Sequence, residues 1–364
     1  MSDRSLKSYT KDVLLRTTLL LPLVLGIAAC TDSDDSESSS IVITPDSVVL
    51  AVIGDVPDQP DSDKAIAEFP QLIQSINTDP TASTTIHVGD IKGGETPCVD
   101  QSYQDVFNLF QTFDQPLIYS IGDNEWTDCD RASAGSYDPE ERLTKLREIF
   151  FSVPGTSLGK TTRQVSAQES YPENQLWQEK GLTFATLHVV GTNNNLITRA
   201  GTPSAVEQSA SGSSEYGRRN NANISWIRNI FQQAMQDQSA GVALFLHADM
   251  WKTREEFSES ILGGFRQTIQ ELSIQAEAFG KPVLIVSGDN RFREDQGVTW
   301  FSLYDVSPVS NITQVIVPRG IQYVSNNTKV RSTWLKLAAN ANPTAESVFD
   351  WVLVSSTYPA PTAQ

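Results

Sequence analysis

The chain has 364 residues, and its 44 acidic side chains outnumber its 27 basic ones, which gives a formal net charge of −17. Hydrophobic residues make up 39% of the sequence, close to the average for globular proteins, so the composition excludes a wholly disordered chain. The acidic balance also argues against a nucleic-acid-binding protein, because such a protein needs a basic surface to replace the counterions of the phosphate backbone. Only three Cys and three His are present.

Residues 1–29 have the features of a secretory signal peptide. A basic stretch over 4–16 precedes an uncharged, Leu-rich segment of about 13 residues, which is shorter than the roughly 20 that a transmembrane helix needs. The segment ends in Ile27-Ala28-Ala29-Cys30, which resembles the lipobox of bacterial lipoproteins. The resemblance implies cleavage before Cys30 and lipid on its thiol. An ordinary signal peptide with an incidental Cys is the alternative.

Residues 30–44 are interpreted as the lipidated Cys and an acidic Ser/Asp tether. Residues 31–40 contain no apolar side chain, so this segment cannot pack and is expected to be flexible. Residues 45–364 are expected to form the folded domain. We therefore expect a bacterial cell-envelope protein that contacts the membrane only through its lipid anchor. Thr31, in place of Asp after Cys30, favours the outer membrane or the cell surface.

The rest of the chain alternates predicted strands and helices. Continuous apolar runs predict buried strands, and apolar residues at helical spacing predict helices. In chain order we predict strand 47–54, helix 63–77, strand 84–88, a helix around 106–110, strand 116–121, helix 139–147, strand 182–190, helix 220–236, strand 242–246, helix 259–279, strand 282–286, and then strands 299–303, 313–317, 333–337 and 348–354. The Ser- and Gly-rich segment 199–219 is a predicted mobile loop. Strand–helix units followed by strands indicate an α/β fold.

Four predicted strands end in the dipeptide Gly-Asp. The pairs are Gly54-Asp55, Gly89-Asp90, Gly122-Asp123 and Gly288-Asp289, and a fifth strand ends in Leu246-His247. One such pair is equally well explained by a turn with a hydrogen-bonding Asp. Four copies predict converging carboxylates, because the carboxyl ends of strands in open α/β sheets face one ligand-binding crevice. Two carboxylates about 4 Å apart repel by roughly 4 kcal/mol at an effective dielectric constant of 20. The cluster therefore requires a cation, and carboxylate, imidazole and amide ligands suit Mn, Fe or Zn.

The order of these motifs resembles the calcineurin-like metallophosphoesterase superfamily. The resemblance is strongest to a bacterial secreted branch that carries Gly-Asp-Asn-Glu-Trp-Thr-Asp-Cys, here residues 122–129. Residues 54–57, 89–92, 171–174 and 191–194 also match stretches of that branch, and the resemblance covers roughly residues 47–300. It implies a four-layer α/β/β/α sandwich with a two-metal site that hydrolyses phosphate mono- or diesters.

The resemblance implies a role for each motif residue. Asp55 would bind the first metal, Asp90 would bridge the two metals, and His247 would bind the second metal. Asp123 stands where the family has a metal-binding Asn, and it is a candidate ligand. Asn124 stands where the family has its catalytic His, so it is a candidate for the catalytic position. If the motif is aligned with a shift of one residue, Asn124 instead stands at the position of the metal-binding Asn and is a candidate metal ligand.

Two motifs depart from the family pattern. Pro57 replaces a His of the first motif and cannot bind a metal, and the last motif has Asp289 and Arg291 where the family usually has two His. Asp289 is a candidate ligand. The Arg291 guanidinium keeps its proton, so we expect it to hold a phosphate or to replace the first metal as a fixed charge. His87 and His188 are interpreted as structural residues.

Three functions remain open at this point, and the last of them is an acidic tethered adhesin. The first is a metal-dependent phosphoesterase with a reduced, His-poor site that holds one or two divalent ions and acts on a phosphorylated small molecule or macromolecule. The second is a degenerate homologue, a surface lipoprotein that binds a ligand or metal without turnover. Asn193 and Asn194, in a loop after a strand, are candidates to bind the substrate or simply to cap a turn. Asp128, Asp130 and Arg131 are expected to line the opening of the same site.

Cys98 and Cys129 are the cysteines that remain besides Cys30. Each lies in the loop that follows a metal-motif strand, and the two strands are expected to be near neighbours. In an exported chain such a pair is expected to form a disulfide. Closing about 30 residues in this way contributes on the order of 3–4 kcal/mol.

Overall fold

The computed structural model describes residues 41–57, 62–196, 214–251, 263–290, 293–296, 304, 306–342 and 347–360. Cys30, the predicted signal peptide, residues 31–40 of the tether and Arg291 lie outside these ranges, as does the predicted strand over 299–303. The described residues belong to one unit, Ser40–Gln364. No helix within the described ranges is both long enough and apolar enough to cross a membrane.

The first of two mixed sheets has the order β11-β12-β1-β2-β3, and β13 also pairs with β12. β1, β2 and β3 are parallel, whereas β12 runs antiparallel to β1, β11 and β13. Ile53 pairs with His87, and His87 pairs with Tyr119, so the carboxyl ends of the three parallel strands are level. The strands are β1 (Val48–Ile53), β2 (Thr84–His87), β3 (Leu117–Tyr119), β11 (Ile321–Val324), β12 (Lys329–Ala339) and β13 (Phe349–Pro359).

The second sheet has the order β4-β5-β6-β7-β8-β10-β9. Its central strands β6, β7, β8 and β10 are parallel, and antiparallel strands complete both edges. Phe245 pairs with Thr186 and with Val286, so the strand ends are level here too. The strands are β4 (Ser166–Gln168), β5 (Tyr171–Glu179), β6 (Leu182–Thr186), β7 (Val242–Phe245), β8 (Val283–Ser287), β9 (Arg293–Gln296) and β10 (Ile312–Ile316).

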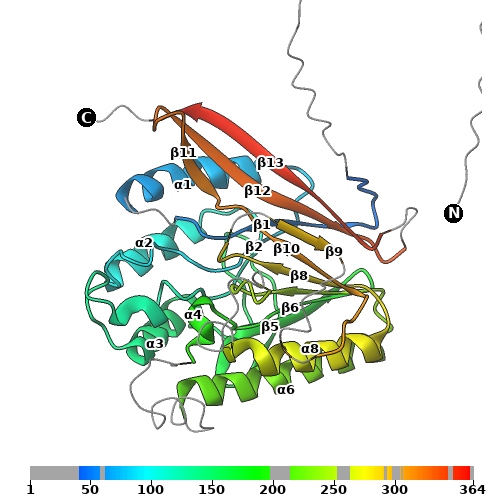
Figure 1. The fold of residues 1–364 in the computed structure, drawn as a ribbon. Coiled ribbons are helices and arrows are strands. Elements are labelled where there is room, and N and C mark those ends of the chain that lie inside the picture. Colours follow the sequence, from blue (N-terminus) through cyan, green and yellow to red (C-terminus); the bar gives the residue numbers. More distant parts are fainter. Residues whose placement is uncertain are drawn as a thin grey trace, which may run out of the picture. The chain divides into compact units, whose positions relative to one another are not determined.

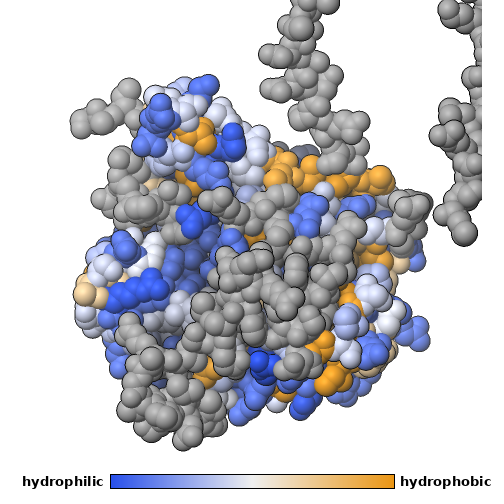
Figure 2. All heavy atoms as spheres, viewed as in Figure 1, coloured by the Kyte–Doolittle hydropathy of each residue, from blue (hydrophilic) through white to orange (hydrophobic). Residues whose placement is uncertain are grey.

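Helices cover the outer face of each sheet. The first sheet packs against α1 (Ser62–Asn77), α2 (Asp100–Phe110) and α3 (Pro139–Phe150), and the second sheet packs against α6 (Glu215–Gln236) and α8 (Arg266–Phe279). Figure 1 shows α6 and α8 side by side along one face. A third apolar cluster fills the space between the two sheets. The predicted four-layer α/β/β/α sandwich is therefore confirmed. Over α2 and α3 the molecular surface is mostly hydrophilic (Figure 2), as expected of amphipathic helices.

Strand β1 shows why a continuous apolar run forms in this fold. Successive side chains of a strand point to opposite faces. Val48, Leu50 and Val52 therefore enter the cluster between the sheets, whereas Ala51 and Ile53 enter the cluster under the helices. Both faces of β1 are buried, so neither face can carry polar side chains.

Several boundaries differ from the sequence prediction. α6 begins at Glu215 rather than Asn220, because the Ser214 side chain accepts a hydrogen bond from the Gly217 amide and caps the helix. The end of the predicted loop 199–219 is thus helical. α8 begins at Arg266 after a short 3₁₀ turn (η3, Gly263–Phe265), and residues 259–262 of the predicted helix lie outside the described ranges. β4, β5, β9 and β11 were not predicted.

Candidate metal centre

The strand ends of both sheets meet around three buried side chains. Asp90 follows β2, Asp123 follows β3 and His247 follows β7, and one ligand atom from each lies within 4.8 Å of the others. The Nε2 atom of His247 is 2.9 Å from Oδ1 of Asp123 and 3.3 Å from Oδ1 of Asp90. The first sheet therefore supplies two carboxylates and the second sheet supplies an imidazole.

The hydrogen bonds of His247 orient its ring toward the carboxylates. Its Nδ1 atom is 2.9 Å from the carbonyl oxygen of Val88. A carbonyl only accepts, so Nδ1 carries a proton and donates it, and Nε2 is the nitrogen available to a metal. Nε2 of His247 and Oδ1 of Asp123 are buried and face each other at 2.9 Å, and neither atom has a further hydrogen-bond partner among the described residues. One imidazole nitrogen and two carboxylate oxygens fit Zn, Mn or Fe.

The three groups titrate together. Burial raises the pKa of Asp90 well above its ordinary value, with His247 opposing and the Asp123 and Glu125 carboxylates adding to the shift. Burial also acts to lower the pKa of His247, but the Asp90 and Asp123 carboxylates raise it well above its ordinary value. Burial acts to raise the pKa of Asp123, but the hydrogen bond and charge of His247 lower it to about 2. Without a cation, the group therefore holds protons that a divalent ion would replace.

Neighbouring residues of the third motif support Asp90. The backbone N–H of Asn124 donates to Oδ1 of Asp90 at 3.2 Å, and its side-chain Nδ2 donates to Oδ2 at 2.7 Å. The amide of Asn124 thus orients a carboxylate through its nitrogen, which cannot bind a metal. Oε1 of the fully buried Glu125 accepts from the N–H of Gly122 at 2.6 Å, from the Tyr119 hydroxyl at 2.6 Å and from the N–H of Asp90 at 3.2 Å. No sequence pattern indicates this supporting role of Glu125.

The backbone at the Gly-Asp pairs is unusual. Asp55, Asp90 and Asp289 have φ of 50°, 61° and 60°, the left-handed region that residues other than Gly, Asn and Asp rarely adopt. Such strain collects at functional sites. At Gly122, a Cβ atom would lie 2.3 Å from the amide nitrogen of Asp90 and 2.4 Å from its Oδ1 atom. Glycine at this position is thus required by the close approach of the Asp90 loop.

Asp55 and Asp289 lie beside the three-residue group. The amide N–H of Asp289 donates to Oδ2 of Asp55 at 3.3 Å. A Cβ atom on Gly288 would lie 2.6 Å from that carboxylate oxygen and 3.5 Å from Nδ1 of His247, so Gly288 separates Asp55 from the imidazole. Asp55 contributes to the raised pKa of Asp90. The ligand roles of Asp55 and Asp289 stay predictions.

The loop after β6 forms a left-handed turn. Thr192, Asn193, Asn194 and Asn195 have φ of 48°, 55°, 53° and 59°. Oδ1 of Asn193 accepts from the N–H of Gly264 at 2.7 Å, and Nδ2 of Asn194 donates to the Gly264 carbonyl at 3.2 Å. The structure therefore shows these two amides anchoring the turn. Their predicted contact with a substrate stays a prediction.

A polar chain leads from Asp123 to the surface. The hydroxyl of Thr192 lies 2.7 Å from Oδ2 of Asp123 and 3.0 Å from Oδ1 of Asp128. The other oxygen of Asp128 is 2.7 Å from Nη2 of Arg131, whose side chain is 45% exposed. Burial raises the pKa of Asp128 to about 7, and Asp123 adds to this shift while Arg131 opposes it. From the sequence, Thr192 was only part of a matched stretch and of a predicted turn, and it was not a candidate site residue.

The predicted disulfide between Cys98 and Cys129 is confirmed. It joins the loop after β2 to the loop after β3, and those loops carry Asp90 and Asp123. The Tyr103 hydroxyl donates to the carbonyl of Glu125 at 2.7 Å and fastens the same segment from α2. The disulfide and this hydrogen bond thus tie together the two loops that carry the carboxylates.

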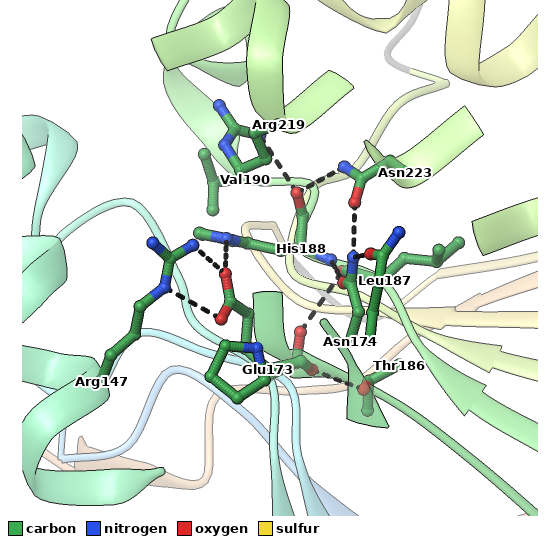
Figure 3. Close-up of polar contacts among 12 residues, drawn as sticks. Arg147, Glu173, Asn174, Thr186, Leu187, His188, Val190, Arg219 and Asn223 are labelled. Carbon is green, nitrogen blue, oxygen red and sulfur yellow. Dashed lines mark hydrogen bonds and ion pairs between the residues drawn. The ribbon is translucent and has the colours of Figure 1, made fainter. Parts of the chain in front are cut away.

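Of the other two histidines, His87 has a satisfied structural position, as expected, whereas His188 is bonded through Nδ1 and its buried Nε2 has no partner among the described residues. Nε2 of His87 donates to the Val56 carbonyl at 2.7 Å, and Nδ1 accepts from the N–H of Gly89 at 3.1 Å. Burial lowers the pKa of His87 to about 4. His188 contacts Glu173 through Nδ1 at 2.8 Å, within the network drawn in Figure 3.

No family model matches the sequence, and no curated protein matches it. Solved structures do match, among them the crystal structure of Vps29 from Chaetomium thermophilum, which is 10% identical. That match covers 87% of this chain and 97% of the Vps29 chain at a TM-score of 0.21. A TM-score this low does not establish a shared fold, so the architecture is assigned from the sheets and helices themselves. They define an α/β/β/α protein with a buried Asp-Asp-His group that could hold a metal ion.

Proposed function

We propose that this protein is an exported, lipid-anchored, metal-dependent phosphoesterase of the calcineurin-like type. The buried group of Asp90, Asp123 and His247 carries the proposal, because its ligand atoms converge within 4.8 Å where Gly-Asp strand ends of two sheets meet. The motif over residues 122–129 and the order of the Gly-Asp pairs support it. When bound, a divalent cation supplies Lewis-acid stabilisation of the charge that develops on a phosphoryl group.

The side chains around this group favour an anionic substrate. Lys92 is buried, and its Nζ donates to the Asn124 carbonyl at 2.6 Å, one residue from Asp123. Arg131 is partly exposed at the end of the chain that leads through Asp128 and Thr192. Positive side chains close to the candidate metal centre would attract a phosphate group there, although the protein as a whole is acidic. Arg291 is proposed to add a guanidinium that holds a phosphate bidentately.

The substrate is proposed to be a phosphorylated small molecule or macromolecule rather than a nucleic acid bound through charge, because the chain is strongly acidic. The proposed location is the bacterial cell envelope. Lipid on Cys30 would hold the protein at the outer membrane or the cell surface, and residues 31–40 would act as the tether.

The second candidate function is a degenerate homologue that binds metal or ligand without turnover. A specific observation favours it. Asn124 stands where the family has its catalytic His, and its amide donates to Asp90. The N–H protons of an amide are too weakly acidic to be transferred to a leaving group at neutral pH, so turnover would depend on other groups.

Metal content and hydrolysis distinguish the candidates. The purified full-length protein is assayed for bound metal and for hydrolysis of p-nitrophenyl phosphate and bis(p-nitrophenyl) phosphate, with and without Mn²⁺. We expect bound metal and turnover, and we expect Asp90→Asn to lose both. Asp114→Asn is the matched control, since Asp114 is an exposed acid that pairs with the exposed Lys160 and is not one of the motif residues. Metal without turnover supports the second candidate, and a protein that binds no metal refutes the proposed centre.

A further inference from the structure

The left-handed turn contains one residue that does not suit it. Asn tolerates the left-handed conformation, so Asn193, Asn194 and Asn195 are ordinary choices for φ of 53° to 59°. Thr192, at φ 48° and ψ 48°, is β-branched, and a β-branched residue there is a true outlier. Strained residues of this kind persist only where surrounding contacts over-determine them.

Contacts behind the turn hold it in place. Asn193 and Asn194 bond to both backbone groups of Gly264. Nη1 of the fully buried Arg219 donates to Oδ1 of Asn194 at 2.5 Å, and its Nη2 donates to the Asn194 carbonyl at 2.9 Å. A Cβ atom on Gly264 would lie 2.0 Å from the carbonyl oxygen of Asn193, so the two segments are in close contact. The strain at Thr192 is therefore maintained by fully bonded neighbours.

The strained position places the Thr192 hydroxyl against Asp123. Oγ1 is 2.7 Å from Oδ2 of Asp123, and the opposite oxygen, Oδ1, is 2.9 Å from Nε2 of His247. A Cβ atom on Gly191 would lie 2.7 Å from the same Oδ2 atom, so the carboxylate lies tightly against the turn. One oxygen of Asp123 is thus held by a hydroxyl while the other faces the metal position.

We propose that Thr192 is a positioning residue for the metal centre. Its hydroxyl sets the orientation of the Asp123 carboxylate, and the left-handed backbone of the turn places the hydroxyl within hydrogen-bond distance of that carboxylate. This inference rests on the proposed function, because it assumes that Asp123 binds a cation. Ligating carboxylates are commonly held by outer hydrogen bonds, and loss of such a bond lowers metal affinity about 10–100-fold.

The test measures Mn²⁺ affinity of the full-length chain by electron paramagnetic resonance of free Mn²⁺. Thr192→Val removes the hydroxyl but keeps the β-branched shape, and we expect its Kd to rise about 10–100-fold. Thr192→Ser keeps the hydroxyl and is expected to retain most of the affinity. Thr192→Ala removes the hydroxyl with less backbone strain, so it serves if the Val variant does not fold. The electron paramagnetic resonance spectrum of bound Mn²⁺ should also change in the Ala and Val variants and not in the Ser variant.

Asp123→Ala, which removes both the carboxylate and any amide ligand, separates this inference from the proposed function. If the wild type binds no Mn²⁺, or if Asp123→Ala binds it as tightly as the wild type, the metal centre is refuted and so is the role of Thr192. If Asp123→Ala loses Mn²⁺ while the Val and Ala variants at Thr192 bind like the wild type, only the positioning role is overturned. Weakened binding in the Val and Ala variants with recovery in the Ser variant supports it.

Discussion

The substitution Glu173→Gln tests the buried hydrogen-bond network drawn in Figure 3, because the stability that this network contributes depends on pH. Glu173 is 1% exposed, and its carboxylate contacts His188 at 2.8 Å and Arg147 at 2.5 Å. Burial acts to raise the pKa of Glu173, but the hydrogen bond and charge of His188 and the charge of Arg147 lower it to about 2 from an ordinary 4.5. A difference of that size corresponds to about 3 kcal/mol of stability from the ionised carboxylate.

The sign of the pH dependence follows from the direction of the shift. The pKa of Glu173 is lower in the folded state than in the unfolded state, so its contribution is complete above about pH 5 and is lost as the pH falls toward 2. By pH 3 the wild type has lost about 2 kcal/mol of the roughly 3 kcal/mol that the ionised Glu173 carboxylate contributes to the free energy of unfolding. Gln cannot ionise, so Glu173→Gln should be less stable than the wild type by about 3 kcal/mol at pH 7 and by about 1 kcal/mol at pH 3.

Urea unfolding followed by tryptophan fluorescence at pH 7 and at pH 3 measures both differences. Glu179→Gln is the matched control, because Glu179 ends the same strand β5 and pairs with Arg163 at 2.9 Å while remaining partly exposed. Its effect should stay below about 1 kcal/mol at either pH. The reasoning would be refuted if the free energies of unfolding of the wild type and Glu173→Gln differed by the same amount at pH 3 and at pH 7.

Three further predictions concern the metal centre and its loops. Replacing both Cys98 and Cys129 by Ala should lower the free energy of unfolding by about 3–4 kcal/mol, measured by urea titration, whereas no change would show that the disulfide adds nothing to stability. Gly122→Ala places a methyl group against Asp90 and should abolish Mn²⁺ binding. The control Gly280→Ala has no close contact at its Cβ position and should bind Mn²⁺ like the wild type. Equal Mn²⁺ affinities of the two variants would contradict this expectation. Removing metal with a chelator should lower the thermal midpoint of the wild type but leave that of Asp90→Asn unchanged, as scanning calorimetry can check.

Much of the fold could be predicted because its signals are local. The apolar run of β1 is continuous since both faces of that strand are buried, and this is visible without knowing its neighbours. α3 carries Asp138 as a cap, Pro139 at its start and acidic residues in its first turn, which are helix-start signals in any context. The Gly-Asp pairs likewise marked the strand ends where the candidate ligands Asp90 and Asp123 lie.

Strand β5 escaped prediction for a physical reason. Its buried positions include Glu173, Asn174 and Gln175, which show no apolar alternation. Glu173 and Asn174 are stable inside because partners far along the chain bond to them, Arg147 on α3 and Asn223 on α6. A sequence pattern cannot show a partner that only the packed fold supplies.

By itself, the sequence determined which residues end the strands and which side chains are available to hold a cation. The tertiary structure decided how they combine. Asp90 and Asp123 come from the first sheet and His247 from the second, and stacking the sheets brings them within 4.8 Å. Thr192 reaches Asp123 through a turn that Gly264 and Arg219 hold in the left-handed region. These contacts join residues distant in the chain, so they exist only once both sheets and their helices are packed.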